Sequence, residues 1–135
     1  RYFRTIKGSL KEGGSSALQG ITIRDDLFDR YRSSEDFIQK YIFPGGFLPS
    51  ISLIKTLIKK NNLHLLEINS YPDDYAKTLS LWRKNFFNAW DSITPLGFDD
   101  SFKRMWEFYL SYCEAGFNSR NINLIQFSMS NKQSL

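Results

Sequence analysis

The side chains that could carry acid–base, nucleophilic or metal chemistry are few in this chain and form no known motif. His64 is the single histidine and Cys113 the single cysteine. The residues therefore offer no zinc site built on cysteine pairs and no internal disulfide. Glu107 and Glu114 share one expected helix, where carboxylates are most often solvated or paired with a nearby cation. The sequence predicts no metal site, catalytic triad or acid–base dyad.

Aromatic side chains are the unusual feature of the composition. They make up 16% of the 135 residues, beside 41% hydrophobic and 24% charged residues. Large rings bury much apolar area, so they can build a core, which is their commoner role, or line a cavity for an acyl chain. No apolar run approaches the roughly 20 residues that span a bilayer. The net charge of +4 suits an anionic lipid surface and is weak support for nucleic acid, which we do not expect as a partner.

The elements that must position these side chains alternate between strand and helix. Strands are expected over residues 16–23, 63–69 and 121–130, which are rich in apolar and β-branched residues. Helices are expected at the start of the chain, over residues 34–41 with Ser33 or Ser34 as N-cap, after Ser50, from about Tyr75, and after Asp99. This alternation predicts an α/β fold in which helices cover a sheet.

A turn rich in proline and glycine separates two of the expected helices. It carries Phe43, Gly45, Gly46, Phe47 and Leu48, and its prolines and glycines continue neither helix nor strand. The apolar residues on both sides of the glycines could form the lip of an acyl tunnel. The segment could equally be a rigid turn, and the residues alone leave both readings open.

Three segments, in this order, resemble the C-terminal part of cyclopropane-fatty-acyl-phospholipid synthases and the related mycolic acid cyclopropane synthases. They are residues 36–50 (DFIQKYIFPGGFLPS), 75–82 (YAKTLSLW) and 102–117 (FKRMWEFYLSYCEAGF). The resemblance covers nearly the whole chain. It implies that residues 1–135 are the C-terminal portion of a class I methyltransferase domain, an α/β Rossmann-like fold of which the chain would hold the last three strands and their covering helices. In that fold the last strand lies antiparallel between the other two.

The resemblance also implies a reaction. Enzymes of this family transfer a methylene group from S-adenosylmethionine to the double bond of an unsaturated acyl chain of a phospholipid and form a cyclopropane ring. The glycine-rich cofactor loop would lie in an N-terminal half outside this chain, so we expect the chain alone to be inactive. The expected location is the cytoplasm, peripheral to the inner face of the membrane.

The family's bicarbonate site, the proposed proton acceptor, maps in part onto this sequence. Matching the strand A-L-Q-G-I places Gln19 where a histidine is expected and Ile21 at an isoleucine, while Tyr75 matches a tyrosine. A glutamine amide can donate a hydrogen bond to an anion but cannot take up a proton. Ring closure is the leading expectation from the resemblance, and because of Gln19 methylation or another acyl modification without ring closure is an alternative. A non-catalytic lipid-binding module is a further alternative.

The same resemblance implies contacts with the substrate and with partners. The residues expected to contact the acyl chain are Phe43, Gly45, Gly46, Phe47, Leu48 and Trp82. A basic surface could meet anionic headgroups, and its candidates are Arg4, Lys7, Lys11, Lys55, Lys59 and Lys60. The strand at residues 16–23 would have an open edge, which we expect to favour association into a homo-oligomer.

Overall fold

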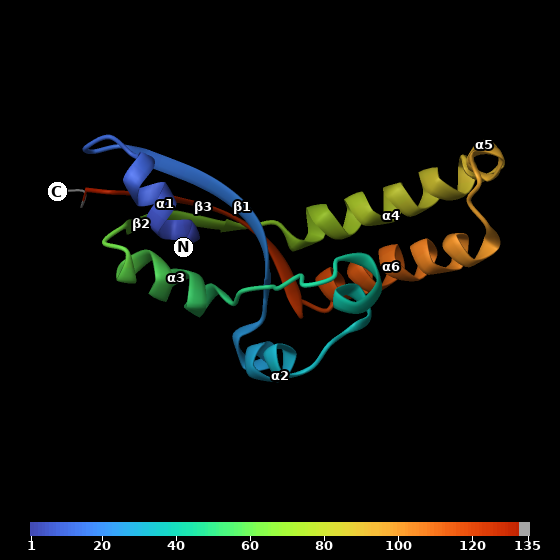
Figure 1. Cartoon of the computed structure of the whole chain (residues 1–135), viewed down its shortest axis with the longest axis horizontal. Coiled ribbons are helices and arrows are strands. Elements are labelled where there is room, and N and C mark those ends of the chain that lie inside the picture. The colour runs from blue at the N-terminus through green and yellow to red at the C-terminus, as the bar shows by residue number, and fades with distance from the viewer. Residues whose placement is uncertain (133–135) are drawn as a thin grey trace.

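The structure, a computed structural model that describes residues 1–132, is built on a three-stranded antiparallel sheet (Figure 1). Its strands are β1 (Ser15–Ile23), β2 (His64–Ser70) and β3 (Ile122–Ser130). The order is β1-β3-β2, and β3 runs antiparallel to both neighbours. The three expected strands are confirmed, with the last strand in the centre as the resemblance implies.

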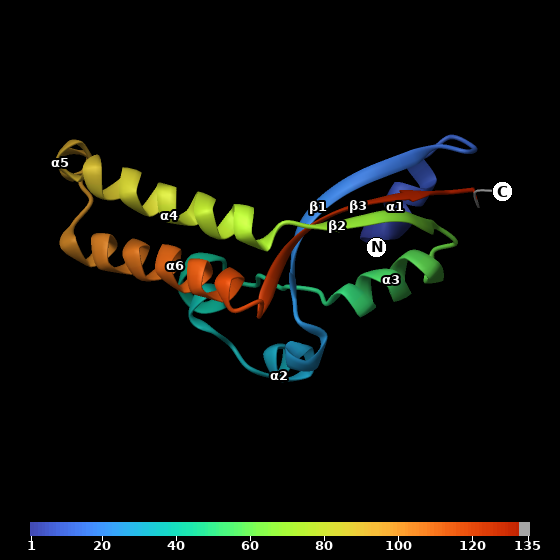
Figure 2. The ribbon, with the colours of Figure 1, turned by 180° about the vertical axis from the view of Figure 1, so that it is seen from behind.

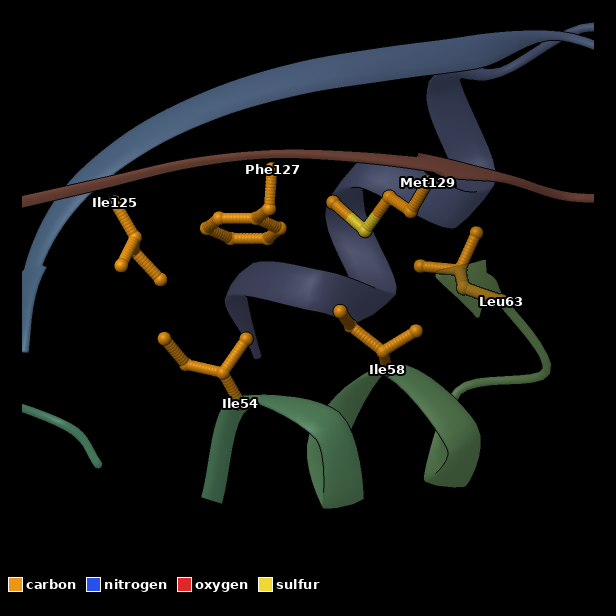
Figure 3. Packing of buried hydrophobic residues seen from close by; sticks show 6 residues of the cluster. All are labelled: Ile54, Ile58, Leu63, Ile125, Phe127 and Met129. Carbon is orange, nitrogen blue, oxygen red and sulfur yellow. The ribbon is translucent and has the colours of Figure 1, made fainter. Parts of the chain in front are cut away.

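Two helices cover one face of this sheet. They are α1 (Tyr2–Ser9) and α3 (Ile51–Lys60). Ile125, Phe127 and Met129 of β3 point toward these helices, because every second side chain of a strand lies on the same face of the sheet. Figure 3 shows the resulting cluster, which also receives partly buried residues of α1; its buried members are Ile54, Ile58, Leu63, Ile125, Phe127 and Met129. This cluster fixes α1 and α3 as one layer on the sheet.

The second half of the chain forms a long helical hairpin that extends from one end of the sheet (Figures 1 and 2). Its arms are α4 (Pro72–Asn88) and α6 (Asp100–Asn118), and its tip holds α5 (Trp90–Ile93) and the 3-10 turn η3 (Thr94–Leu96). A second buried cluster joins the base of the hairpin to β3; it consists of Ala76, Leu79, Leu110, Phe117 and Leu124. No helix among residues 1–132 is long and apolar enough to cross a membrane.

The helix expected over residues 34–41 is confirmed only in its second half, where residues 37–42 are helical, and its expected start and caps are wrong. The structure instead has a 3-10 turn η1 (Asp25–Leu27) that leads into α2 (Phe28–Ser33), and then a short π-helix η2 (Ile38–Ile42). Neither serine caps a following helix, because the hydroxyls of Ser33 and Ser34 donate to the Arg30 carbonyl, 3.0 Å away in each case. They close the end of α2 instead.

The turn before η2 is organised by Asp36 and Gln39. The Asp36 carboxylate accepts from the Gln39 N–H at 2.9 Å, and the Gln39 side chain accepts from the Asp36 N–H at 3.0 Å. This reciprocal pair is the arrangement of a capping box. The signal was present in the sequence as an acidic residue followed three positions later by glutamine.

Two predicted helix starts are confirmed by their hydrogen bonds. The Ser50 hydroxyl accepts from the Leu53 N–H at 3.2 Å, and the Asp99 carboxylate accepts from the Phe102 N–H at 2.8 Å. The hairpin helix α4 begins earlier than expected. Its first residue is Pro72, whose fixed φ and missing N–H suit the first turn of a helix, so Tyr75 lies one turn inside.

Candidate functional site

Tyr75 lies at the base of the hairpin, where α4 leaves the sheet. Its ring packs edge-on against Phe117 of α6, with ring centres 4.9 Å apart, and against Trp82 of α4 at 6.1 Å. Burial raises the pKa of the Tyr75 hydroxyl above its ordinary value, and the neighbouring Cys113 raises it further. The hydroxyl is therefore protonated at neutral pH and available as a hydrogen-bond donor.

Two further residues of α6, Tyr109 and Cys113, lie beside Tyr75. Burial raises the pKa of Tyr109 to about 12, with smaller effects of Cys113 and Tyr75. Burial also raises the pKa of the Cys113 thiol to about 11. All three side chains pack against the second buried cluster. The sequence signal was the spacing of Tyr109 and Cys113 on the aromatic stripe of α6, which puts them on the face toward α4.

Ile21 and Gln19 occupy one face of β1, two positions apart. Ile21 packs against the same buried cluster as Tyr75, so the structure brings these two expected site residues together. Gln19 lies opposite Gln126 of β3, whose amide nitrogen donates to the Gln19 oxygen at 2.9 Å. This bond uses the Gln19 oxygen as an acceptor, so the amide N–H groups of Gln19 are its remaining donors.

A largely apolar cavity of about 270 Å³ lies along the open edge of β1. Gln19, Ile21 and Phe47 line it together with residues of α1, α3 and β3. The Phe47 ring packs against the rings of Phe28 and Tyr31, with ring centres 5.7 and 6.1 Å away. Gln19 and Ile21 therefore border this cavity from the strand edge, while their side chains lie on the opposite face of the sheet from Leu18, which also lines it.

The proline–glycine turn has a defined conformation. Gly45 adopts a positive φ of 78°, which favours glycine, and the Gly46 N–H closes the turn on the Phe43 carbonyl at 2.8 Å. A Cβ at Gly46 would lie 2.9 Å from that carbonyl oxygen. The turn is thus rigid and requires both glycines.

Side chains from outside the turn hold it in place. The Gln39 amide donates to the Gly46 carbonyl at 3.1 Å, and the Leu48 N–H donates to the Tyr31 hydroxyl at 3.2 Å. The turn directs its two phenylalanines to different places, since Phe43 meets the Tyr109 ring at 6.0 Å while Phe47 faces the cavity of β1. A rigid turn and the lip of an acyl tunnel are both compatible with this geometry, because a rigid turn presents both phenylalanine rings.

The hairpin brings uncharged, partly buried side chains together on one cluster. Tyr75, Tyr109 and Cys113 are uncharged at neutral pH, and Trp82 is half exposed beside them. Within residues 1–132 no cluster of three or more His, Cys, Asp or Glu side chains could hold a metal ion. The site therefore suits a hydrocarbon chain better than a charged substrate.

The residues described do not fit S-adenosylmethionine. Such cofactors are held where a strand leads through a glycine-rich turn into a helix. Over residues 1–132 no strand does so, since Gly13 precedes β1 and Gly45 lies between η2 and α3. We assign no residue of this chain to that cofactor.

Comparison with known proteins identifies the family. The family model of mycolic acid cyclopropane synthetase matches residues 1–127. The chain therefore belongs to this family. The structure is similar to the mycolic acid cyclopropane synthase CmaA1 solved with SAH and CTAB, with a TM-score of 0.83 and 26% identity over 96% of this chain and 48% of that one. The expected α/β methyltransferase fold is confirmed.

Curated relatives give the range of activities in the family. Tuberculostearic acid methyltransferase UfaA1 of Mycobacterium tuberculosis is 40% identical over 130 residues, which cover 96% of this chain and 30% of the relative. Cyclopropane-fatty-acyl-phospholipid synthase of Escherichia coli is 32% identical over 128 residues, covering 93% and 31%. The chain thus spans about a third of the length of these relatives, which are methyltransferases and cyclopropane synthases.

The Cys113 thiol gives a direct test of the burial of the site. We expect its alkylation by iodoacetamide near neutral pH to be about 100-fold slower than that of an ordinary thiol, because a pKa of about 11 in place of 9.0 leaves that much less thiolate. The rate should rise with pH toward 11 and become normal in urea. Since the folded pKa lies above the unfolded one, the free energy of unfolding should fall as pH rises from about 9 toward 11. A rate in the folded protein equal to that in urea would contradict the buried position.

Proposed function

We propose that the protein containing this chain transfers a methyl group from S-adenosylmethionine to the double bond of an unsaturated fatty acyl chain. The chain described here supplies acyl-contacting residues and part of an anion site. The observation that carries this proposal is the uncharged grouping of Tyr75, Tyr109 and Cys113 in a chain of this family. A charged substrate would lose its hydration there without gaining a partner of opposite charge, whereas methylene groups gain from burial.

The proton released in such a reaction must be accepted by a group other than Tyr75, Tyr109 and Cys113. Addition of a methyl cation to an alkene carbon leaves a carbocation, which becomes neutral when an adjacent C–H bond gives up its proton. Tyr75, Tyr109 and Cys113 all carry their own protons at neutral pH, so none can accept it. We propose bicarbonate as the acceptor, with the Tyr75 hydroxyl and the Gln19 amide as donors of hydrogen bonds to it.

Methylation without ring closure is the product that we favour. The chain is 40% identical to a tuberculostearic acid methyltransferase and 32% identical to a cyclopropane-fatty-acyl-phospholipid synthase. It also has Gln19 where the resemblance predicts a histidine. Ring closure on a phospholipid acyl chain is the second candidate, which the likeness to cyclopropane-fatty-acyl-phospholipid synthase supports. The two products differ in olefin content. Ring closure takes the proton from the transferred methyl group and leaves no double bond, whereas loss of a proton from a chain carbon next to the cation leaves a methyl branch and one double bond.

Substitution of Gln19 tests this choice. We expect Gln19→His to raise the share of cyclopropane product, because it restores the residue that the resemblance to cyclopropane synthases predicts here and adds a group that can take up the proton of the transferred methyl group. Lipids extracted after reaction would be compared by proton NMR, which separates cyclopropyl from olefinic signals. Asn69→His is the matched control, since Asn69 is exposed and lies across β3 from Gln19, opposite the same Gln126. An unchanged ratio in Gln19→His would remove Gln19 from the choice of product.

A further inference from the structure

The excess of positive charge in this chain lies in one structural layer. Residues 1–11 and 50–66, which contain α1 and α3, hold seven basic residues and no acidic one; the seven, called the basic layer below, are Arg1, Arg4, Lys7, Lys11, Lys55, Lys59 and Lys60. The whole chain has 18 basic and 14 acidic residues. The remainder therefore has 11 basic and 14 acidic residues, a net charge of −3. The positive net charge of the chain arises entirely from this layer.

The two helices of the basic layer lie on the same face of the sheet. Both pack on the cluster shown in Figure 3, with Ile54 and Ile58 of α3 facing β3 and α1 beside them. Lys7 links α1 to the turn that follows α3, since its ammonium donates to the Asn62 carbonyl at 2.9 Å. Six of the seven basic side chains are exposed, and Lys7 is partly buried. The charges therefore belong to one rigid surface.

The basic layer has no internal neutralisation. The ion pairs of the described residues are Arg24–Asp26, Arg32–Asp29, Arg83–Glu114 and Arg120–Asp73, and none includes a residue of the layer. Asp25 is close enough to Lys55 to be influenced by it. The pKa of Asp25 is lowered mainly by hydrogen bonding to Ser50, however, and Lys55 is the smallest contributor. Six exposed cations that form no ion pair among residues 1–132 create a positive potential that attracts anions.

A groove of about 630 Å³ runs between α3 and the outer strand β2. Lys55, Lys59 and His64 line it together with an apolar floor that includes Ile58 and Leu66, the latter 46% exposed. Tyr2, 61% exposed on α1, adds an amphipathic ring of the kind enriched at membrane interfaces. Cations beside exposed apolar surface match a phosphate headgroup joined to its acyl chains better than a polar polyanion.

We propose that the basic layer docks the protein on an anionic phospholipid surface, with a headgroup phosphate between Lys55 and Lys59 in the groove. The inference deepens the proposed function, because it states how a lipid-modifying enzyme would meet its substrate. Two features favour lipid as the partner. The positive charge of the layer complements anionic headgroups, and the floor of its groove is apolar. The long axis of α3 then lies close to the lipid surface.

Vesicle sedimentation tests this proposal without any measurement of methyl transfer. The protein should bind vesicles of phosphatidylcholine mixed with phosphatidylglycerol, and bind pure phosphatidylcholine much more weakly. Lys55→Gln combined with Lys59→Gln should weaken binding by about 25-fold, at about five-fold for each lysine near a membrane surface. Lys77→Gln combined with Lys84→Gln removes the same charge from exposed positions of α4 and should change binding by less than about two-fold.

Several results would overturn the proposal. They are equal losses in the two double variants, no loss in either, equal binding to neutral and mixed vesicles, or tighter binding to polyglutamate or DNA than to the mixed vesicles. Circular dichroism of both double variants checks that they fold, which is expected because all four lysines are exposed. A failure of vesicle binding in a protein that still transfers methyl groups would contradict the docking surface and leave the proposed reaction intact.

Discussion

Replacement of Phe117 by alanine is expected to lower the free energy of unfolding by about 3–5 kcal/mol. Phe117 is fully buried, with 0% of its surface exposed, in the cluster that joins α4, α6 and β3. The substitution leaves a cavity that the ends of two helices and a strand can fill only in part. Urea denaturation followed by circular dichroism would measure the change in midpoint at constant slope.

Phe98→Ala is the matched control for this substitution. Phe98 lies near the tip of the hairpin, is 42% exposed, and meets Phe102 with ring centres 4.6 Å apart. Loss of that ring pair should cost about 1 kcal/mol. Equal losses in the two variants would mean that the base of the hairpin is no better packed than its tip, contrary to the structure.

Replacement of Tyr75 by phenylalanine is expected to lower kcat by about 100-fold, as for the loss of one preorganised hydrogen-bond donor. Burial holds the pKa of Tyr75 above its ordinary value, so the hydroxyl stays protonated and the loss should be constant across the neutral pH range. The ring contacts with Phe117 and Trp82 are retained, so stability should change little. Steady-state kinetics with an unsaturated lipid would measure the effect.

Tyr112→Phe serves as the control for Tyr75→Phe. Tyr112 also lies on a hairpin helix but is 45% exposed and stacks on Phe108. Its substitution should leave kcat within about two-fold of the original value, because surface positions away from a site contribute little. If Tyr75→Phe were as active as Tyr112→Phe, the Tyr75 hydroxyl would have no part in the reaction.

The regular parts of this fold could be predicted from local patterns. Each strand is a short apolar run between turn residues, and Ser50 and Asp99 cap helices because their side chains reach the next turn. The same rule failed at Ser33 and Ser34, whose hydroxyls bond backward to α2. A serine beside a helix can cap the next helix or close the previous one, and the local sequence does not distinguish the two.

Only part of the candidate site could be predicted, because its contacts depend on how distant segments of the chain pack together. The resemblance placed Tyr75 and Ile21, and the structure puts both on one buried cluster. The contact of Gln19 with Gln126 depends on the register of strands 107 residues apart, which no local pattern determines. The position of Tyr109 beside Tyr75 likewise depends on how α4 and α6 pack, so the sequence alone did not place Tyr109 in the candidate site.

The central claim is methyl transfer to an unsaturated acyl chain, and isotope transfer tests it most directly. The full-length protein would be incubated with S-adenosylmethionine carrying a trideuterated methyl group and with an unsaturated lipid, and the acyl chains would be analysed by mass spectrometry. We expect acyl chains that have gained one labelled carbon, in an amount that falls sharply in Tyr75→Phe. Acyl chains that bind to the protein but gain no label would contradict the claim and indicate a non-catalytic lipid-binding protein.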